Sequence, residues 1–348
     1  MENVGNYAST SLWALAWRRL RSDRVALVAM AIVGIFLVSL GCSFSGLLAA
    51  DWDQEIAINF APPSFIVEQD IADGNVLPSE ASISTAGSTS IEYYGIVDPL
   101  ENEMAEIRAS VPVSSSKVVL HKQTSLPFGA DKWGRDIIKK TIKGAETSIV
   151  VGLVAAVLAT FLGTVFGALS GYYGRWVDDC FNWFYSVFTS VPYLLLILAV
   201  AAVLQQKGIM TIVLILGLTG WTGTYRLVRA EYLKHKVREY VLAADAIGAS
   251  DWRKIFIHIF PNVSHVALVQ VSILVVGFIK SEVILSFLGF GVPVGVVSWG
   301  SMLNEAQNEL ILGKWWQLTA ASAAMAVLVT AFSLLTDGLR DALDPKLK

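Results

Sequence analysis

Long apolar runs recur along this chain and are separated by shorter polar stretches. A transmembrane helix needs roughly 20 predominantly apolar residues, and six runs are long enough to meet that requirement. The six runs lie at residues 25–48, 147–169, 181–204, 209–225, 263–287 and 316–337. The fourth run is the shortest, and Gly217 and Gly220 interrupt it. The hydrophobic pattern therefore predicts an all-α membrane protein with six transmembrane helices.

A short amphipathic segment, residues 239–262, lies between the fourth and fifth runs and reads EYVLAADAIGASDWRKIFIHIFPN. One face of a first helix would carry Tyr240, Val241, Ala244 and Ile247. A second helix would place four apolar residues at i, i+3, i+4 and i+7: Trp252, Ile255, Phe256 and Ile259. Gly248 can adopt the left-handed conformation that ends the first helix, Ser250 can cap the second, and Pro261 is expected to end it. The pattern predicts a helical hairpin that does not span the membrane.

Basic residues are distributed unevenly around the apolar runs. Four arginines precede the first run: Arg18, Arg19, Arg21 and Arg24. Seven basic residues lie in the loop that contains the hairpin: Arg226, Arg229, Lys234, Lys236, Arg238, Arg253 and Lys254. Because Lys and Arg are enriched in cytoplasmic loops, we expect both termini and the hairpin to be cytoplasmic. Lys139, Lys140 and Lys143 oppose this rule, but they belong to a long translocated loop, where the rule is weak.

These observations divide the chain into five segments. They are a cytoplasmic interfacial helix at 1–24, a first transmembrane helix at 25–48, an extracytoplasmic insert at 49–140, a five-helix core at 141–338 with its cytoplasmic loop at 226–262, and a cytoplasmic tail at 339–348. The first run is about 24 residues long, well beyond the roughly 7–15 of a cleaved signal peptide, so we interpret it as a true span. Most of the insert, from about residue 50 to 125, is rich in Ser, Thr, Asp, Glu and Pro, with short β-like runs such as 116–120. A lid and a docking surface are both open interpretations of it.

Composition excludes an ordinary soluble protein. Of the 348 residues, 54% are hydrophobic and 16% charged, and the mean hydropathy is +0.57. Cys42 and Cys180 are far apart in sequence, and the four histidines show no metal-ligand spacing. Segment 129–135 is close to a phosphate-binding loop, but Arg135 and Asp136 replace the Lys-Ser/Thr pair that grips phosphate and magnesium. We therefore predict no catalytic residue, no metal site and no cofactor bound by this chain. We expect the chain to lie in the lipid bilayer and to have no nucleic acid partner.

Three glycines within the second run fall on one helix face. Gly163, Gly167 and Gly171 are spaced four apart, so another helix can approach their backbone closely. Packing within this chain and an interface with a second membrane subunit both fit the pattern.

Lys280 and Glu282 are the charges deepest in an apolar run. Each would cost about 2.5–3.5 kcal/mol at the centre of a bilayer on insertion scales. Because they are two residues apart, they project to nearly opposite sides of a helix and do not neutralise each other. We predict that one or both face a partner helix or a water-filled translocation path; a path and a structural ion pair between subunits both fit the pattern.

Several segments taken together resemble a known family. The matching segments are LPFGADKWGRD at 126–136, GYYGRWVD at 171–178, GW at 220–221 with RLVR at 226–229, the hairpin from Glu239 to Asp251, PN at 261–262, Glu282 with LSFLG at 285–289, SWGS at 298–301 and DGLRDALDP at 337–345. They are similar to membrane permeases of binding-protein-dependent ABC importers, specifically the peptide/nickel branch, whose cytoplasmic loop carries an "EAA" motif. The resemblance runs from residue 126 to the C-terminus, nearly two-thirds of the chain.

The resemblance implies a type I ABC importer permease fold in the bacterial inner membrane. Such a chain is paired with a homologous second permease subunit, sits above two ABC ATPase subunits, and receives substrate from an extracytoplasmic binding protein. ATP and Mg²⁺ would bind in the ATPase subunits. The chain is most similar to the second permease subunit of a dipeptide or oligopeptide importer.

The resemblance also assigns a role to the hairpin, which would couple the permease to the ATPase subunits. The implied coupling residues are Glu239, Ala243, Ala244, Asp245, Gly248, Asp251 and Arg253. The sequence departs from the family pattern here, because Leu242 replaces the glutamate that names the loop and Asp245 replaces a usually basic residue. Lys280 also stands where the family is normally apolar.

Other functions remain open at this level. The same kind of complex could carry nickel chelates or antimicrobial peptides instead of di- and oligopeptides. A stand-alone secondary carrier or channel would need no ATPase, and a membrane receptor or assembly factor would use the hairpin to dock a signalling protein.

Overall fold

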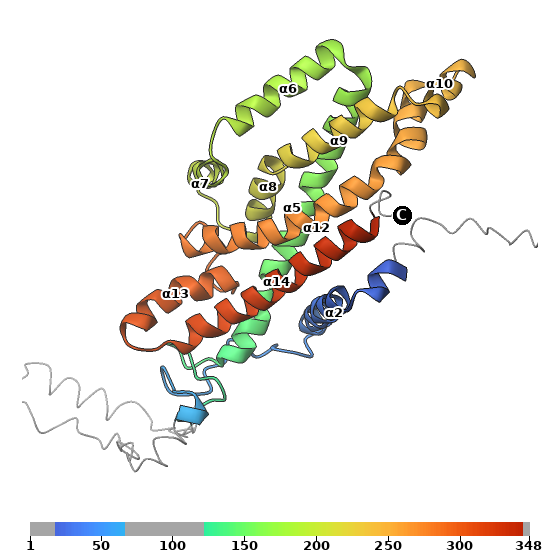
Figure 1. Cartoon of the computed structure of the whole chain (residues 1–348). Coiled ribbons are helices and arrows are strands. Elements are labelled where there is room, and N and C mark those ends of the chain that lie inside the picture. The colour runs from blue at the N-terminus through green and yellow to red at the C-terminus, as the bar shows by residue number, and fades with distance from the viewer. Residues whose placement is uncertain (1–17, 67–121, 344–348) are drawn as a thin grey trace, which may run out of the picture. The chain divides into compact units, whose positions relative to one another are not determined.

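The computed structural model describes residues 18–66 and 122–343 (Figure 1). It divides into two compact units, one made of Met1–Gln54 with Ile137–Lys348 and the other of Glu55–Asp136. In its described residues the larger unit has helices as its only regular secondary structure. Most of the predicted interfacial helix at 1–24 and the β-like run at 116–120 lie outside the described residues.

Five helices of the larger unit are long and apolar enough to cross a membrane. They span Arg24–Phe44, Ile137–Tyr173, Ile209–His235, Asp251–Phe287 and Trp316–Ala342. The first is α2 (Arg24–Phe44), the second α5 (Ile137–Tyr173), and the last belongs to α14 (Trp316–Leu343). The third joins α8 (Ile209–Thr219) to α9 (Thr222–His235), and the fourth ends in α12 (Phe260–Phe287). The prediction of a multi-helix membrane protein therefore holds.

The third predicted span, residues 181–204, is wrong as one continuous helix. The structure has two helices there, α6 (Arg175–Thr189) and α7 (Tyr193–Leu204), bent by 85° at a short break. Pro192 causes the break, because it has no N–H to donate to the preceding turn and disfavours helical geometry in the residue before it. The bent pair has the composition of one span, and counting it as such gives six.

The fourth span also differs from its prediction. The apolar run was expected to end at residue 225, but the helix continues through a polar stretch to His235. The continuation is stabilised by packing, since Tyr225, Val228 and Tyr232 are all buried. Tertiary contacts thus extend a helix whose local sequence no longer resembles a membrane span.

Helix α5 is the central element of the larger unit, and it packs against α8, α9 and α12. The glycine stripe lies on its contact with α9 of the same chain. A Cβ added to Gly163 would lie 2.6 Å from the Cβ of Thr224 and 2.7 Å from the carbonyl oxygen of Trp221. One added to Gly171 would lie 2.7 Å from the Cβ of Tyr232. The backbones of α5 and α9 therefore approach each other too closely to admit a side chain at these glycines.

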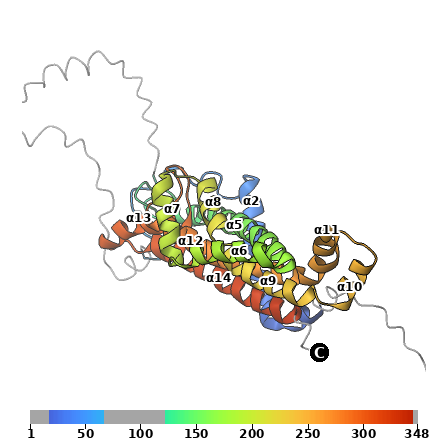
Figure 2. The same cartoon turned by 90° about the horizontal axis from the view of Figure 1, so that it is seen from above.

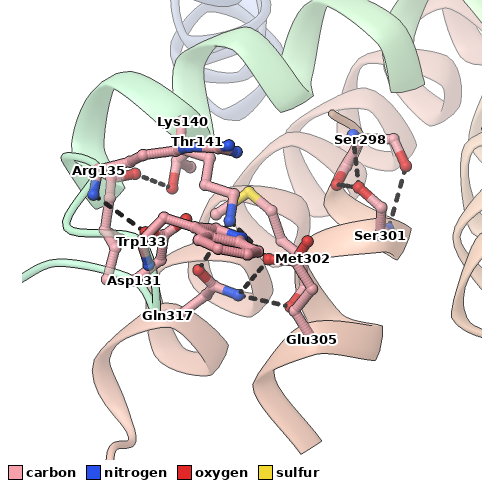
Figure 3. Close-up of polar contacts among 11 residues, drawn as sticks. Asp131, Trp133, Arg135, Lys140, Thr141, Ser298, Ser301, Met302, Glu305 and Gln317 are labelled. Atoms are coloured by element: carbon pink, nitrogen blue, oxygen red, sulfur yellow. Dashed lines mark hydrogen bonds and ion pairs between the residues drawn. The ribbon is translucent and has the colours of Figure 1, made fainter. Parts of the chain in front are cut away.

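A buried polar network joins α5 to α14 and to the short helix α13 (Trp299–Ile311) (Figure 3). Lys140 Nζ lies 2.6 Å from Glu305 Oε2 and 3.2 Å from Gln317 Oε1. Gln317 Nε2 in turn donates to the backbone oxygen of Met302 at 3.1 Å. The Lys140 side chain is almost fully buried, so its hydrogen bonds to these partners replace those that it would make with water.

The smaller unit has little regular structure in its described residues. Isolated bridges pair Ala57 with Gln123 and Pro63 with Leu126 in parallel, and Ala130 with Asp136 in antiparallel. A small apolar cluster lies between them, formed by Ala57, Ala61, Leu126 and Ala130.

The α5–α9 contact can be tested with Gly163→Ala. The added methyl group would overlap α9, and overpacking of this kind costs about 1–3 kcal/mol. Gly223→Ala is the matched control, because no heavy atom lies within 4 Å of its added Cβ. A helical Gly→Ala change alone stabilises by about 0.5–1 kcal/mol. Thermal unfolding of the purified protein should therefore move to lower temperature for Gly163→Ala and not for Gly223→Ala; equal midpoints would contradict the packing.

Candidate functional site

The predicted hairpin forms at the end of α9, and Figures 1 and 2 show α10 and α11 projecting there from the helical bundle. Its first helix is α10 (Glu239–Ala246), and Gly248 follows with φ +79°, which is the left-handed conformation expected of it. Ser250 then occupies the cap position of α11 (Asp251–Arg253), although its side chain makes no capping hydrogen bond.

Pro261 does not end the second helix, and that prediction is wrong. Helix α11 continues through a π-helical stretch, Lys254–Ile259, directly into α12, so that Asp251–Phe287 is continuous. The change of register at the π-helical stretch places Pro261 in the first turn of α12. A proline is tolerated there because the hydrogen bonds of a first turn do not need its N–H. The hairpin is therefore joined rigidly to a membrane-spanning helix.

One side of the hairpin is packed against the ends of α5 and α9. Seven buried residues form this anchor cluster: Ala168, Val228, Tyr232, Val241, Ile255, Ile259 and Val263. Of the four residues predicted to share a face of the first helix, only Val241 and Ala244 are buried. Tyr240 and Ile247 are exposed, because the anchor is narrower than the face that the sequence pattern indicates.

The opposite side of the hairpin presents large apolar side chains to the surroundings. Leu242 is 56% exposed, Trp252 67% and Ile247 84%. Where such apolar groups form a contiguous patch, the patch is typical of an interaction surface. Leu242, which stands where the family has a glutamate, belongs to this exposed side.

An ion-pair cluster closes the corner of the hairpin. Lys254 Nζ lies 2.5 Å from Asp245 Oδ1 and 3.0 Å from Asp251 Oδ1. The Tyr172 hydroxyl, at the end of α5, donates to Asp251 Oδ1 at 2.8 Å. The two arms of the hairpin are thus tied to each other and to α5. Asp245, which departs from the family pattern, is explained by this pair.

Sequence reasoning missed the contacts of Lys254 and Tyr172, which hold the corner of the hairpin. The i,i+3 spacing of Asp251 and Lys254 was the available signal for one contact. The contact with Asp245 was not readable, because it depends on the angle at Gly248. Tyr172 lies on a different helix, far away in sequence.

Two further contacts hold the hairpin to α9. The Tyr232 hydroxyl donates to the carbonyl oxygen of Ile255 at 3.2 Å, inside the π-helical stretch. His235 Nδ1 and the Tyr240 hydroxyl lie 2.8 Å apart. Partial desolvation of the hydroxyl raises the pKa of Tyr240, although the residue as a whole is exposed.

A second charged cluster fixes the part of α9 that leads to the hairpin. Arg229 forms a bidentate pair with Asp178 of α6, with N···O distances of 2.5 and 2.6 Å. Ser170 of α5 donates to the same carboxylate at 2.5 Å. A planar guanidinium that meets a carboxylate in this way orients both side chains. Helices α5, α6 and α9 are joined at the level from which the hairpin departs.

The seven predicted coupling residues all lie on the hairpin, but they do not share one environment. Six are exposed: Glu239, Ala243, Asp245, Gly248, Asp251 and Arg253. Ala244 is buried and packs inward. Their role in coupling stays a prediction.

The two predicted path residues lie in different surroundings. Glu282 is fully buried and accepts hydrogen bonds from Ser148 of α5 at 2.6 Å and from Ser286 at 2.7 Å. Ser148 also accepts the backbone N–H of Trp299 at 3.3 Å, so Glu282 links α12 to α5 and α13. Lys280 is exposed and makes no ion pair or hydrogen bond with a residue that the structure describes. The geometry therefore gives Glu282 an internal packing role and leaves Lys280 as the residue that can face a path.

The segment that is close to a phosphate-binding loop folds around its own carboxylate. The N–H groups of Trp133 and Arg135 both donate to Asp131 Oδ1, at 2.9 and 3.0 Å. These donors are the ones that a phosphate would need. Among residues 18–66 and 122–343, no group of three or more His, Cys, Asp or Glu side chains could hold a metal ion.

Comparisons with known proteins match both ends of the chain. Residues 163–348 match the family described as binding-protein-dependent transport system inner membrane component, and residues 11–63 match the N-terminal TM domain of oligopeptide transport permease C. The dipeptide transport system permease protein DppC of Bacillus subtilis (strain 168) is 38% identical over 221 residues, which are 64% of this chain and 69% of that protein. DppC of Lactococcus lactis subsp. cremoris (strain MG1363) is 32% identical over 337 residues, 95% of this chain and 90% of the relative.

A solved structure of the MetNI methionine ABC transporter, in inward-facing conformations, is 13% identical in sequence with a TM-score of 0.49, and the match covers 60% of this chain and 98% of that one. The family match spans more than half of the chain, including the whole hairpin and the helices on either side of it. This chain is therefore a multi-pass membrane protein that belongs to the permease family of binding-protein-dependent ABC transport systems, the inner membrane components.

Proposed function

We propose that the chain is the permease subunit of an ATP-driven importer that carries dipeptides or oligopeptides across a bacterial inner membrane. The names of its relatives, which are dipeptide and oligopeptide permeases, support the cargo. The observation that carries the mechanism is the hairpin, which is rigidly anchored on one side and presents apolar side chains on the other. A stand-alone carrier would have no use for such an element.

The hairpin, the N-terminal arginines and the C-terminal end of α14 face the cytoplasm in this proposal. A cavity lined by Lys234, His265 and Arg340 brings the end of α14 to the level of the hairpin. A second, lined by Arg19 and Asp341, brings the N-terminal arginines to the same level. Basic residues from three parts of the chain thus gather at one end of the helices, as cytoplasmic ends do. Residues 49–140 then lie on the extracytoplasmic side, where a binding protein would dock.

Force reaches the membrane through the hairpin. Two partner ATPase subunits bind ATP and Mg²⁺, and one of them covers the exposed side formed by Leu242, Ile247 and Trp252. When the ATPase subunits close, the hairpin moves as one body, because the Lys254 cluster and the anchor cluster hold its two arms together. The motion passes to α9 and to α12, which is continuous with the second arm. A path between this chain and a homologous second permease opens in response.

Peptide uptake in a strain that lacks this chain tests the function directly. Uptake of a labelled dipeptide or oligopeptide should be lost in the deletion strain and restored by the wild-type chain, provided that the ATPase and binding-protein partners are present. The partners should co-purify with the chain. Normal peptide uptake in the deletion strain, or a chain that accumulates peptide without any ATPase, would overturn the proposal.

The corner at Gly248 yields a second prediction. A non-glycine residue in the left-handed region costs roughly 1–2 kcal/mol, and asparagine tolerates it better than a β-branched residue does. No heavy atom lies within 4 Å of an added Cβ at this position, so strain and not a clash decides the outcome. Gly248→Val should reduce uptake about tenfold or more and uncouple ATP hydrolysis from transport, whereas Gly248→Asn should keep most of the activity. The idea fails if the two variants transport equally well.

Lys280 yields a third prediction. An ammonium in a membrane span costs about 2.5–3.5 kcal/mol, and within the described part of the chain nothing offsets it. If it faces the path and attracts carboxylates of the cargo, Lys280→Met should slow peptide uptake several-fold while the complex assembles normally, and Lys280→Arg should restore uptake. Loss of assembly in Lys280→Met would instead indicate an ion pair between subunits. Wild-type uptake by Lys280→Met would exclude both roles.

A further inference from the structure

A cavity of about 570 Å³ lies between α9, α12 and the end of α14, and the mechanism above does not use it. Its volume falls within the roughly 300–1,000 Å³ that is typical of small-molecule pockets. Side chains from three helices line it, and they are of two kinds. Charged side chains lie toward one end of the helix axes and mostly apolar side chains toward the other.

The charged side chains lie at the hairpin end of the cavity. Helix α9 runs toward the hairpin and α12 runs away from it, so Glu231, Lys234 and His265 are close to that end. Arg340 joins them from the last turns of α14. The lining deeper along α12 is apolar as far as Ile273, about 12 Å further at 1.5 Å per residue, apart from one glutamine. The cavity is therefore charged at the membrane boundary and apolar within the span.

The charged end carries a net positive charge. Lys234 is paired with Glu231 at 2.6 Å, which leaves the two nearly balanced. Arg340 lines the cavity and makes no ion pair or hydrogen bond with any residue in the described ranges. A free guanidinium presents a fork of N–H donors that fits a phosphate.

The motif at 337–345 explains why Arg340 points into the cavity. A Cβ at Gly338 would lie 2.8 Å from the Cβ of Ala26, so this side of α14 packs directly against α2. Residues two apart on a helix project to nearly opposite sides. Close packing at Gly338 thus turns Arg340 toward α9 and α12.

We propose that this cavity binds an anionic glycerophospholipid of the cytoplasmic leaflet. The phosphate of its headgroup meets Arg340 and His265, and the upper part of an acyl chain lies along Val269 and Ile273. Basic pockets between membrane helices on the cytoplasmic side are suited to such lipids. The order of charged and apolar lining favours a lipid over free phosphate, which has no use for the apolar depth. The inference rests on the orientation in the proposed function and not on the identity of the cargo.

Lipid titration of the purified, delipidated transporter complex in neutral detergent tests the inference. Native mass spectrometry would compare phosphatidylglycerol with phosphatidylcholine of the same acyl chains. We expect phosphatidylglycerol to bind about tenfold more tightly, because both lipids carry the phosphate but the choline of phosphatidylcholine adds a positive charge that the basic end of the cavity repels. Arg340→Gln should abolish this preference. Ile273→Trp, at a position that is 42% exposed, should weaken the binding of both lipids, because the larger side chain fills the apolar part of the cavity.

Arg175→Gln is the matched control, because it removes an exposed arginine at the same end of the helices that does not line the cavity. It should bind phosphatidylglycerol as the wild type does. The inference is overturned if the two lipids bind equally or if Arg340→Gln leaves the preference unchanged. It is also overturned if an equal concentration of inorganic phosphate, or a cargo peptide, displaces phosphatidylglycerol. Peptide uptake is measured separately, so a failed lipid preference with normal uptake contradicts only this inference, and lost uptake with an intact lipid preference contradicts only the proposed function.

Discussion

The close approach of α5 and α9 is the contact on which the other features of the helical unit depend. Gly163, Gly167 and Gly171 remove the side chains that would keep the two backbones apart, and α9 meets them with Thr224, Tyr225 and Tyr232. Without a hydrophobic driving force between helices in lipid, such backbone contact is a principal way for membrane helices to associate. The contact also places the ends of α5 and α9 side by side, where they form the platform for the hairpin.

The hairpin shows how a short polar element can be made rigid outside the hydrocarbon core. Burial alone would not suffice, because two short arms offer few apolar residues. The anchor cluster is therefore supplemented by the ion pairs of Lys254 and by the Tyr232 hydroxyl, which contacts the backbone inside the π-helical stretch. π-Helical turns are rare and often lie at functional sites. Here the turn joins the second arm to α12 without a flexible link, which is what transmission of a movement requires.

Buried and half-buried charged side chains connect the helices of this protein to one another. Lys140 connects α5 to α13 and α14, Glu282 connects α12 to α5, and Arg229 connects α9 to α6. Each has hydrogen-bond or ion-pair partners within the chain, which hold its side chain in place. Lys280 and Arg340 are different, since no described residue pairs with either of them. Lys280 lies within a membrane span and Arg340 lines a cavity, and the proposals for cargo and lipid follow from these positions.

The sequence by itself determined the class of the protein, most of its spans, the corner at Gly248 and the resemblance to importer permeases. All of these depend on local composition or on a residue's own conformational preference. Tertiary structure decided the rest. The break at Pro192 and the continuation through Pro261 show the same residue type with opposite outcomes, because only the second falls in the first turn of a helix. The contact of Asp245 with Lys254, the enclosure of Glu282 by Ser148 and the cavity at Arg340 bring together residues from different arms or helices. No periodicity encodes such contacts, since they depend on how the helices pack in space.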